Sequence, residues 1–256
     1  MFSIGIDIGS TCTKTVVMNE SGEMIEMLLQ PTGWSSVDTA EQIRKSLESK
    51  GICIDDAKIV ATGYGRISVP YADRQVTEIT CHAKGAYYLN ENKDMVVIDI
   101  GGQDTKIIKI ESGQVKDFIM NDKCSAGTGR FVEIMANTMG LTIDELCELA
   151  RTGSGVTISS MCTVFAESEV ISLIGRGEDR KNIAYAVVSS IASKVASQCS
   201  HMDTKNAVVY LTGGLCECAF LKERIEQMIG HELVTNSKAR FAGAIGAALI
   251  AASKGA

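Results

Sequence analysis

The sequence has little proline, few aromatic residues and no long apolar run. Its 256 residues include two Pro, one Trp and 5% aromatic residues, against 24 Gly. The longest run of small apolar residues, 242–252, is well short of the roughly 20 residues that span a bilayer, so we expect no membrane segment. Scarce proline and abundant glycine favour a regular α/β fold whose tight turns are made by glycine.

Blocks of basic residues are also lacking. The formal net charge is −6, and no cluster of Lys and Arg interrupts the acidic balance, which argues against a nucleic-acid or anionic-membrane partner. The first residues lack a basic segment and place Asp7 inside the apolar stretch, so we expect no targeting segment. Nine cysteines, an odd number, indicate a reducing, cytoplasmic setting in which thiols stay free or bind metal.

Two common nucleotide motifs, the Walker sequence GxxxxGK[ST] and the dinucleotide fingerprint, are absent. A repeat is present instead: DIGSTCTK at 7–14 returns as DIGGQDTK at 99–106, and ESGEM at 20–24 returns as ESGQV at 111–115. Each copy predicts an apolar strand, a glycine turn, a second strand, a Glu-Ser-Gly turn and a third strand. We therefore expect two related lobes with a cleft between them, one at 1–93 plus 242–256 and the other at 94–241.

Apolar spacing predicts several further elements. Val37, Ala40, Ile43 and Leu47 recur at helical spacing, and Ile183 to Val195 recur every four residues in a long buried helix. The expected elements are helices at 36–50, 79–89 and near 142–151, strands at 57–62, 96–101 and 207–211, and a closing Ala-rich helix that returns to the first lobe.

The repeated glycine turns suit phosphate binding. Glycine lets backbone N–H groups approach phosphate oxygens, Ser10, Thr11 and Thr13 add hydroxyls, and a carboxylate at a strand end can hold hydrated Mg²⁺. One such turn alone is no more than a strand ending in a tight turn. Two turns in register, followed by a third at 212–214, are a stronger signal.

This pattern resembles the actin, Hsp70 and sugar-kinase superfamily over the whole chain. The resemblance implies an α/β protein with two related lobes of the actin-like ATPase (ribonuclease H-like) fold and a nucleotide cleft between them. It implies that Asp7 and Asp99 position Mg²⁺ and the attacking water, that Gln103 orients this water, and that Asp104 is a second acidic candidate or a solvated turn residue. The residues implied to bind ATP or ADP are Gly9, Ser10, Thr11, Cys12, Thr13, Lys14, Gly101, Gly102, Gln103, Asp104, Lys106, Gly127, Gly129, Gly213 and Gly214, in which Lys14 and Lys106 offset phosphate charge.

The cysteine segments carry a more specific resemblance. NDKCSAGTGRF at 121–131 and SSMCTVFAESEVIS at 159–172, with ATGYGR at 61–66 and TCHA at 80–83, look like the activators of 2-hydroxyacyl-CoA dehydratases, a family that includes ATPase subunits of benzoyl-CoA reductase and reductases of double-cubane proteins. In that family each subunit gives two cysteines to one 4Fe-4S cluster, and the matching residues are Cys124 and Cys162. The resemblance implies an anaerobic homodimer with one cluster, a dehydratase or double-cubane protein as electron acceptor, and ferredoxin or flavodoxin as electron donor.

Other interpretations remain open at this point. By spacing alone Cys124 and Cys162 are two ordinary buried thiols, and the fold also suits a small-molecule kinase with a carboxylate base or a nucleotide switch without redox chemistry. Cys216 and Cys218 form a weak candidate metal pair. The cysteines expected in the core are Cys53, Cys81, Cys147 and Cys199.

Overall fold

The computed structural model describes residues 1–159, 162–204 and 207–253. Its contacts divide the chain into two compact units. Unit 1 comprises Met1–Met95, Ile110–Asp117 and Lys238–Ala256, and unit 2 comprises Val96–Lys109 and Phe118–Ser237. The lobe boundaries expected from the repeat stay a prediction. Residues 160–161 of the second cysteine segment and 254–256 of the expected first lobe lie outside the described residues.

Unit 1 is built on a five-stranded sheet with the order β3-β2-β1-β4-β5. The sheet is mixed, because β1 pairs antiparallel with β2 and parallel with β4. Its strands are β1 (Phe2–Ile8), β2 (Cys12–Met18), β3 (Met24–Pro31), β4 (Ala57–Thr62) and β5 (Arg74–Gln75). Its helices are α1 (Ser36–Ser49), α2 (Glu78–Leu89) and α8 (Ala242–Ala252), with short 3₁₀ turns at Ile54–Asp56, Arg66–Ser68 and Ala239–Phe241. The helices expected at 36–50 and 79–89 and the strand at 57–62 are confirmed.

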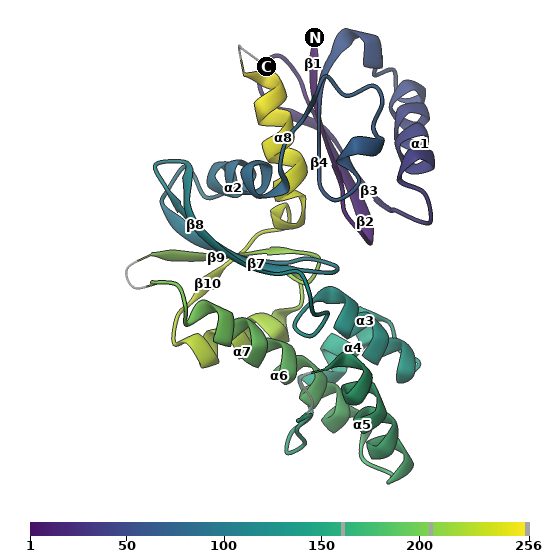
Figure 1. The fold of residues 1–256 in the computed structure, drawn as a ribbon, viewed down its shortest axis with the longest axis vertical. Coiled ribbons are helices and arrows are strands. Elements are labelled where there is room, and N and C mark those ends of the chain that lie inside the picture. Colours follow the sequence, from purple (N-terminus) through teal and green to yellow (C-terminus); the bar gives the residue numbers. More distant parts are fainter. Residues whose placement is uncertain (160–161, 205–206, 254–256) are drawn as a thin grey trace. The chain divides into compact units, whose positions relative to one another are not determined.

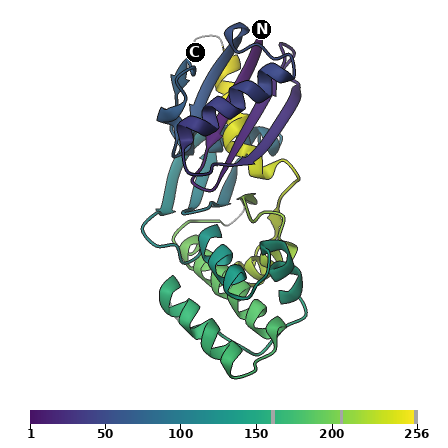
Figure 2. The same cartoon turned by 90° about the vertical axis from the view of Figure 1, so that its right-hand side faces the viewer.

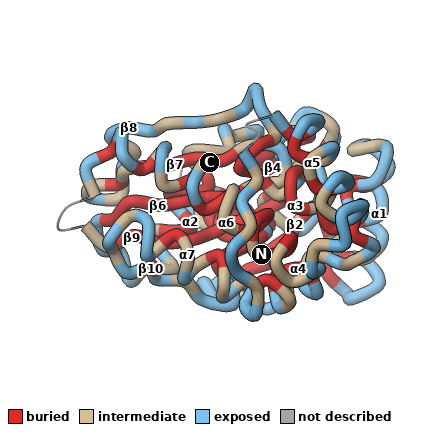
Figure 3. Tube along the Cα trace, turned by 90° about the horizontal axis from the view of Figure 1, so that it is seen from below, coloured by how far each residue is buried: buried red, intermediate tan, exposed pale blue. Residues whose placement is uncertain are grey.

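Alternate residues of β1 point to opposite faces of this sheet. Ile4, Ile6 and Ile8 are fully buried and pack in one core cluster with Ile43 and Leu47 of α1. The spacing of Ile43 and Leu47 places both on one side of α1, whose opposite side is exposed (Figure 3). Helix α1 therefore covers one face of the sheet through a continuous apolar layer.

The other face of the sheet is covered by α8, which approaches it closely at glycine and alanine positions (Figure 2). A Cβ added at Gly5 of β1 would lie 1.9 Å from the carbonyl oxygen of Ala244, and one at Gly246 would lie 1.7 Å from that of Cys81 in α2. Neither distance leaves room for a side chain. The expectation that the closing Ala-rich helix returns to the first lobe is confirmed.

Unit 2 contains most of a second five-stranded sheet, with the order β10-β9-β6-β7-β8, and a group of helices (Figure 1). Its strands are β6 (Met95–Ile100), β7 (Thr105–Glu111), β8 (Gln114–Asn121), β9 (Val208–Gly213) and β10 (Leu233–Val234). Its helices are α3 (Gly129–Thr138), α4 (Ile143–Ala150), α5 (Thr163–Gly175), α6 (Arg180–Cys199) and α7 (Ala219–Ile229). Helix α6 buries the expected positions from Ile183 to Val195 and contacts α3, α4, α5 and α7.

The described part of the chain has no helix that combines the length and the hydrophobicity needed to cross a membrane.

Candidate functional site

The first hairpin loop, between β1 and β2, is held by Thr32 at the end of β3. The Thr32 hydroxyl donates a hydrogen bond to the carbonyl oxygen of Gly9 at 2.7 Å and shares another with the hydroxyl of Thr13 at 2.8 Å. The Thr32 N–H donates to the carbonyl oxygen of Thr11 at 2.9 Å. Thr13 and Thr32 are buried, whereas Thr11 at the loop tip is exposed. No sequence motif pointed to Thr32, whose hydrogen bonds hold the shape of this loop.

Asp7, at the end of β1, lies in a space left by two glycines. Its side chain is buried, and its β-ladder partner across the hairpin is Lys14. A Cβ at Gly63 would lie 2.4 Å from Asp7 Oδ1, and one at Gly243 would lie 2.6 Å from Asp7 Oδ2. Gly63 belongs to the ATGYGR segment, so this motif makes room for a carboxylate.

The second hairpin loop, between β6 and β7, contains a buried lysine held by two carboxylates. The Lys106 side chain is 1% exposed, and its Nζ lies 2.8 Å from Asp104 Oδ1 and 3.4 Å from Asp99 Oδ2. Burial removes water from Lys106 and Asp99, so each depends on its partners for compensation, whereas the Asp104 side chain is 25% exposed. Asp104 is thus an ion-pair partner rather than a solvated turn residue. Gln103, at the loop tip, is exposed.

The glycine turn after β9 packs against the end of β6. The Thr212 hydroxyl donates to Asp99 Oδ1 at 3.3 Å, and the Gly214 N–H donates to the carbonyl oxygen of Ile100 at 3.1 Å. Gly213 has φ +88°, and a Cβ there would lie 2.3 Å from the same Ile100 oxygen. The third glycine turn of the sequence therefore lies directly beside the second hairpin loop.

The start of α3 is bonded to this second loop. The N–H of Gly129 donates to the carbonyl oxygen of Gly101 at 2.9 Å, and the N–H of Arg130 donates to that of Gly102 at 2.8 Å. The first N–H groups of a helix lack partners within it, and here two of them bind the loop. Gly129 thereby lies at the second hairpin loop, and its implied part in nucleotide binding stays a prediction.

The same segment leads back to the two cysteines. The Thr128 hydroxyl donates to the carbonyl oxygen of Ser125 at 2.7 Å, and the hydroxyls of Ser125 and Thr163 lie 2.7 Å apart. Ser125 directly follows Cys124, and Thr163 directly follows Cys162, the N-cap residue of α5. Both thiols are exposed. The structure therefore brings together two cysteines that are 38 residues apart in the sequence.

The chain matches the BadF/BadG/BcrA/BcrD ATPase family over residues 4–251. It belongs to this family. The (R)-2-hydroxyglutaryl-CoA dehydratase activating ATPase of Acidaminococcus fermentans is 40% identical over 259 residues, which cover 100% of this chain and 99% of the relative. The activator of the 2-hydroxyisocaproyl-CoA dehydratase from Clostridium difficile, solved with bound ADPNP, is 34% identical with a TM-score of 0.91, covering 98% of this chain and 94% of that one.

Solved structures of much lower sequence identity share the fold of this ATPase family member. A ROK family glucokinase from Streptomyces griseus is 16% identical with a TM-score of 0.62, covering 98% of this chain and 99% of that one. This similarity concerns the fold alone. Together with the two mixed sheets, it confirms the actin-like ATPase and sugar-kinase fold expected from the repeated hairpin.

Of the four cysteines of this family member that were expected in the core, one is exposed. Cys53 is exposed because it lies in the turn that leads into the 3₁₀ segment Ile54–Asp56, so its assignment to the core is wrong. The interpretation of Cys124 and Cys162 as buried thiols is also wrong. The cysteines confirmed in the core are Cys81, Cys147 and Cys199.

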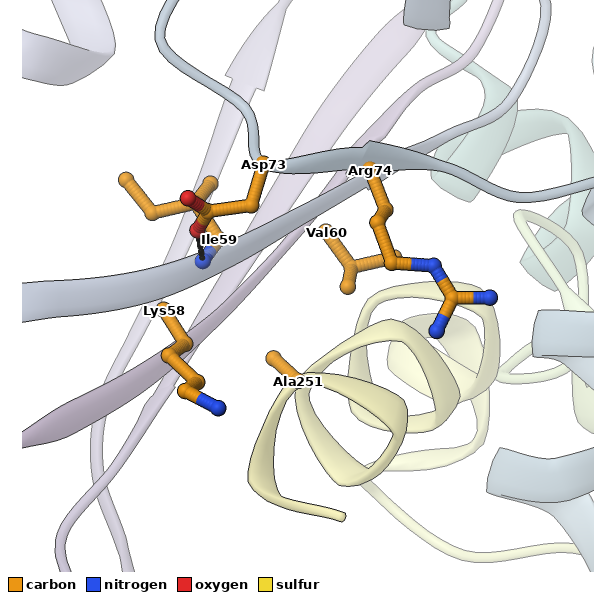
Figure 4. Close-up of a pocket in the computed structure, with 6 residues that line it drawn as sticks. All are labelled: Lys58, Ile59, Val60, Asp73, Arg74 and Ala251. Atoms are coloured by element: carbon orange, nitrogen blue, oxygen red, sulfur yellow. Dashed lines mark hydrogen bonds between the residues drawn. The ribbon is translucent and has the colours of Figure 1, made fainter. Parts of the chain in front are cut away.

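A small cavity in unit 1 is unrelated to the hairpin loops (Figure 4). It measures about 90 Å³ and is lined by Lys58, Ile59, Val60, Asp73, Arg74 and Ala251. The Asp73 carboxylate accepts a hydrogen bond from the Ile59 N–H at 2.7 Å, which serves the strand pairing. The cavity lies beside the middle and start of β4, whereas Asp7 aligns with Thr62 at the strand's other end. We assign it no chemistry.

Proposed function

We propose that this family member is an ATP-hydrolysing, homodimeric 4Fe-4S protein that passes a low-potential electron to a partner enzyme. The observation that carries this proposal is the pair of exposed cysteines, Cys124 and Cys162, whose next residues in the chain, Ser125 and Thr163, are hydrogen-bonded through their hydroxyls. A kinase or a nucleotide switch of this fold has no use for such a pair. The exposure of Cys124 and Cys162 distinguishes this pair from Cys81 and Cys199, which are buried in the core.

The donor set fits half of an iron–sulfur site. A 4Fe-4S cluster takes four cysteine thiolates, and two from each of two symmetric chains complete that number. Cys162 occupies the N-cap of α5, where the helix dipole stabilises a thiolate. One cluster per homodimer supplies the one-electron chemistry, and Cys124 and Cys162 are its ligands from each chain.

Dimer formation is supported by the apolar surface of α5, the helix that begins directly after Cys162. Val164, Phe165, Ile171 and Ile174 are all exposed on this helix. Within unit 2, α5 contacts α3 and α6 (Figure 1). Large apolar side chains gathered on one surface element indicate a protein interface. A second copy bound at α5 covers these side chains and brings its own two cysteines to the first pair.

In this proposal each hairpin loop contributes to nucleotide binding. Gly9 to Lys14 supply N–H groups, hydroxyls and one cationic group to phosphate, and Gly101 to Lys106 do the same in unit 2. Asp7 and Asp99 position Mg²⁺ and the attacking water, and Gln103 orients this water, because phosphoryl transfer requires positioning more than a strong base. Gly213 and Gly214 lie against the nucleoside.

In this proposal a series of hydrogen bonds connects the second hairpin loop to the cysteines. The second loop is bonded to the N–H groups of Gly129 and Arg130, and the preceding residue, Thr128, is bonded to Ser125. Ser125 is in turn bonded to Thr163. A change in the loop when the γ-phosphate leaves moves the start of α3, and with it the arrangement of the two thiols.

The electron acceptor in this proposal is a 2-hydroxyacyl-CoA dehydratase, because both relatives described above are named as activators of such enzymes. A double-cubane cluster protein is the alternative acceptor. Ferredoxin or flavodoxin is the electron donor, since each delivers single electrons to iron–sulfur proteins.

Anaerobic purification with iron and sulfide analysis tests the cluster. We expect about two iron atoms per chain in the wild type, corresponding to one 4Fe-4S cluster per dimer. Cys124→Ser and Cys162→Ser should each lose the iron and the brown colour. Cys53→Ser is the matched control, because Cys53 is also exposed but lies in unit 1. A colourless wild type that phosphorylates a small molecule would favour the kinase instead.

A further inference from the structure

A second cavity in unit 1 is not used by the proposed function. It measures about 510 Å³, and pockets that hold small molecules measure roughly 300–1,000 Å³. Its lining includes Lys84, Tyr87 and Tyr88 of α2, Leu249 of α8 and the β7–β8 turn at 112–114. All these segments belong to unit 1. The cavity is therefore built within one compact unit, from residues other than those of the hairpin loops.

The β7–β8 turn is the second copy of the Glu-Ser-Gly repeat, and the two copies differ in what they contact. In the first copy the Ser21 hydroxyl is bonded within its own turn, and a Cβ added at Gly22 would have no atom within 4 Å. In the second copy Ser112 has φ +51° and Gly113 has φ +72°, as in a rigid two-residue hairpin turn. A Cβ added at Gly113 would lie 3.2 Å from Cε1 of Tyr87. The second turn therefore packs on an aromatic ring and forms one wall of the cavity.

The polar side chains of the lining are not engaged with one another. Within the part of the chain that the structure describes, five of them have no hydrogen-bond or ion-pair partner in the protein: Lys84, Tyr87, Tyr88, Asn92 and Gln114. They offer an ammonium group, two phenolic hydroxyls and two amide groups. These groups remain available to a ligand in the cavity.

The charge of the lining is positive. Lys84 is its one charged residue, and no carboxylate is among the lining residues. The nearest acidic residues in the sequence already have partners: Glu91 forms an ion pair with Lys93 at 2.6 Å, and Asp94 accepts a hydrogen bond from the Ser112 N–H at 2.7 Å. A single cation without a protein counter-ion favours an anionic ligand.

We propose that this cavity binds a small organic anion with a flat apolar body, of the class of aromatic carboxylates and aromatic phosphate esters. The Lys84 ammonium binds the anionic group through charge-assisted hydrogen bonds. The rings of Tyr87 and Tyr88 and the side chain of Leu249 contact the flat body, because aromatic rings combine a large apolar surface with a polar edge. This binding is independent of the nucleotide and of the cluster.

The test titrates the anaerobically purified protein with phenylacetate and, separately, with phenyl phosphate, followed by ligand-observed NMR. Saturating ADP is present, so that phenyl phosphate does not enter the nucleotide site. We expect saturable binding with a Kd on the order of 1 mM, as for other ligands of about ten heavy atoms, and the tighter probe identifies the anionic group. Phenylacetamide, which has the shape of phenylacetate without its charge, should bind about tenfold more weakly. Equal binding of phenylacetamide, or no saturable binding of either anion, overturns the proposal.

Two matched pairs of variants locate the bound probe. Lys84→Met, on the exposed side of α2, should weaken binding about tenfold, whereas Lys58→Met, at the smaller cavity, should not change it. Gly113→Ala displaces the Tyr87 ring and should weaken binding about threefold. Gly22→Ala, in the first copy of the turn, should bind like the wild type. Unchanged affinity in Lys84→Met overturns the proposal, and unchanged affinity in Gly113→Ala overturns the placement of the flat body on Tyr87.

Discussion

The placement of Asp7 by two glycines leads to a prediction in which stability and activity change in different directions. Gly63 has φ +84°, whereas Gly243 lies in the first turn of α8. An added Cβ would nevertheless lie close to the Asp7 carboxylate at both positions, 2.4 Å away at Gly63 and 2.6 Å away at Gly243. Substitution by alanine at either glycine should therefore displace the same carboxylate. The consequences for stability differ, since a Cβ at Gly63 would also lie 2.6 Å from the carbonyl oxygen of Ile8.

The magnitudes follow from these distances. An ordinary contact of at least 3.4 Å requires Asp7 to move by about 1 Å for either variant, and a misplacement of about 1 Å can cost roughly 100-fold in rate. Gly63→Ala also takes a left-handed backbone, which costs an L-residue about 1–2 kcal/mol. Gly243→Ala instead replaces a helical glycine, which favours α8 by up to about 1 kcal/mol.

ATP hydrolysis and urea unfolding of the anaerobic protein distinguish these effects. Both variants should lose about two orders of magnitude in ATPase rate, with Gly63→Ala destabilised and Gly243→Ala at least as stable as the wild type. Gly22→Ala is the matched control, because Gly22 has φ +80° with no atom within 4 Å of the added Cβ. It should lose stability and keep its activity. Wild-type ATPase in Gly243→Ala would refute the role assigned to Asp7.

Three further predictions concern unit 2 and α5. Lys106→Met should lower the free energy of unfolding by about 3–5 kcal/mol in urea titrations, because it leaves two carboxylates without their cation; a loss below 1 kcal/mol would contradict the buried ion pair. Val164→Glu should produce monomers in sedimentation, whereas Val37→Glu, on α1, should not. Ser125→Ala combined with Thr163→Val should speed iron loss to a chelator about fivefold, the equivalent of one hydrogen bond of about 1 kcal/mol, with ATPase unchanged.

The parts of the fold that depend on local pattern could be predicted from the sequence. The structure contains the expected strand at 57–62, the expected helix at 36–50 and the expected Ala-rich helix. Such elements are determined by the spacing of apolar residues and by the glycines at which helices end. The repeated hairpin also identified both loops. In the third glycine turn, Gly213 has φ +88°, a backbone conformation that favours glycine.

The contacts that organise the site could not be predicted, because they join segments distant in sequence. Thr32 reaches back 23 residues to Gly9, and Ser125 reaches forward 38 residues to Thr163. A single threonine or serine in a loop carries no periodic signal, so only the folded chain reveals its partner. Cys53 shows the same limit, since an apolar neighbourhood in the sequence did not prevent its exposure in a turn.

The two copies of the hairpin are anchored in different ways, and this difference assigns them different tasks under the proposed function. The first loop is held by Thr32, a buried residue of unit 1 that directly follows β3. The second loop is held by backbone N–H groups of Gly129 and Arg130, at the start of the helix that follows Cys124. Under the proposed function, a shift of phosphate contacts at the second loop pulls on the start of α3 through these bonds. The second copy of the repeat is therefore the one through which nucleotide state reaches the thiols, and substitutions there should alter cluster properties as well as hydrolysis.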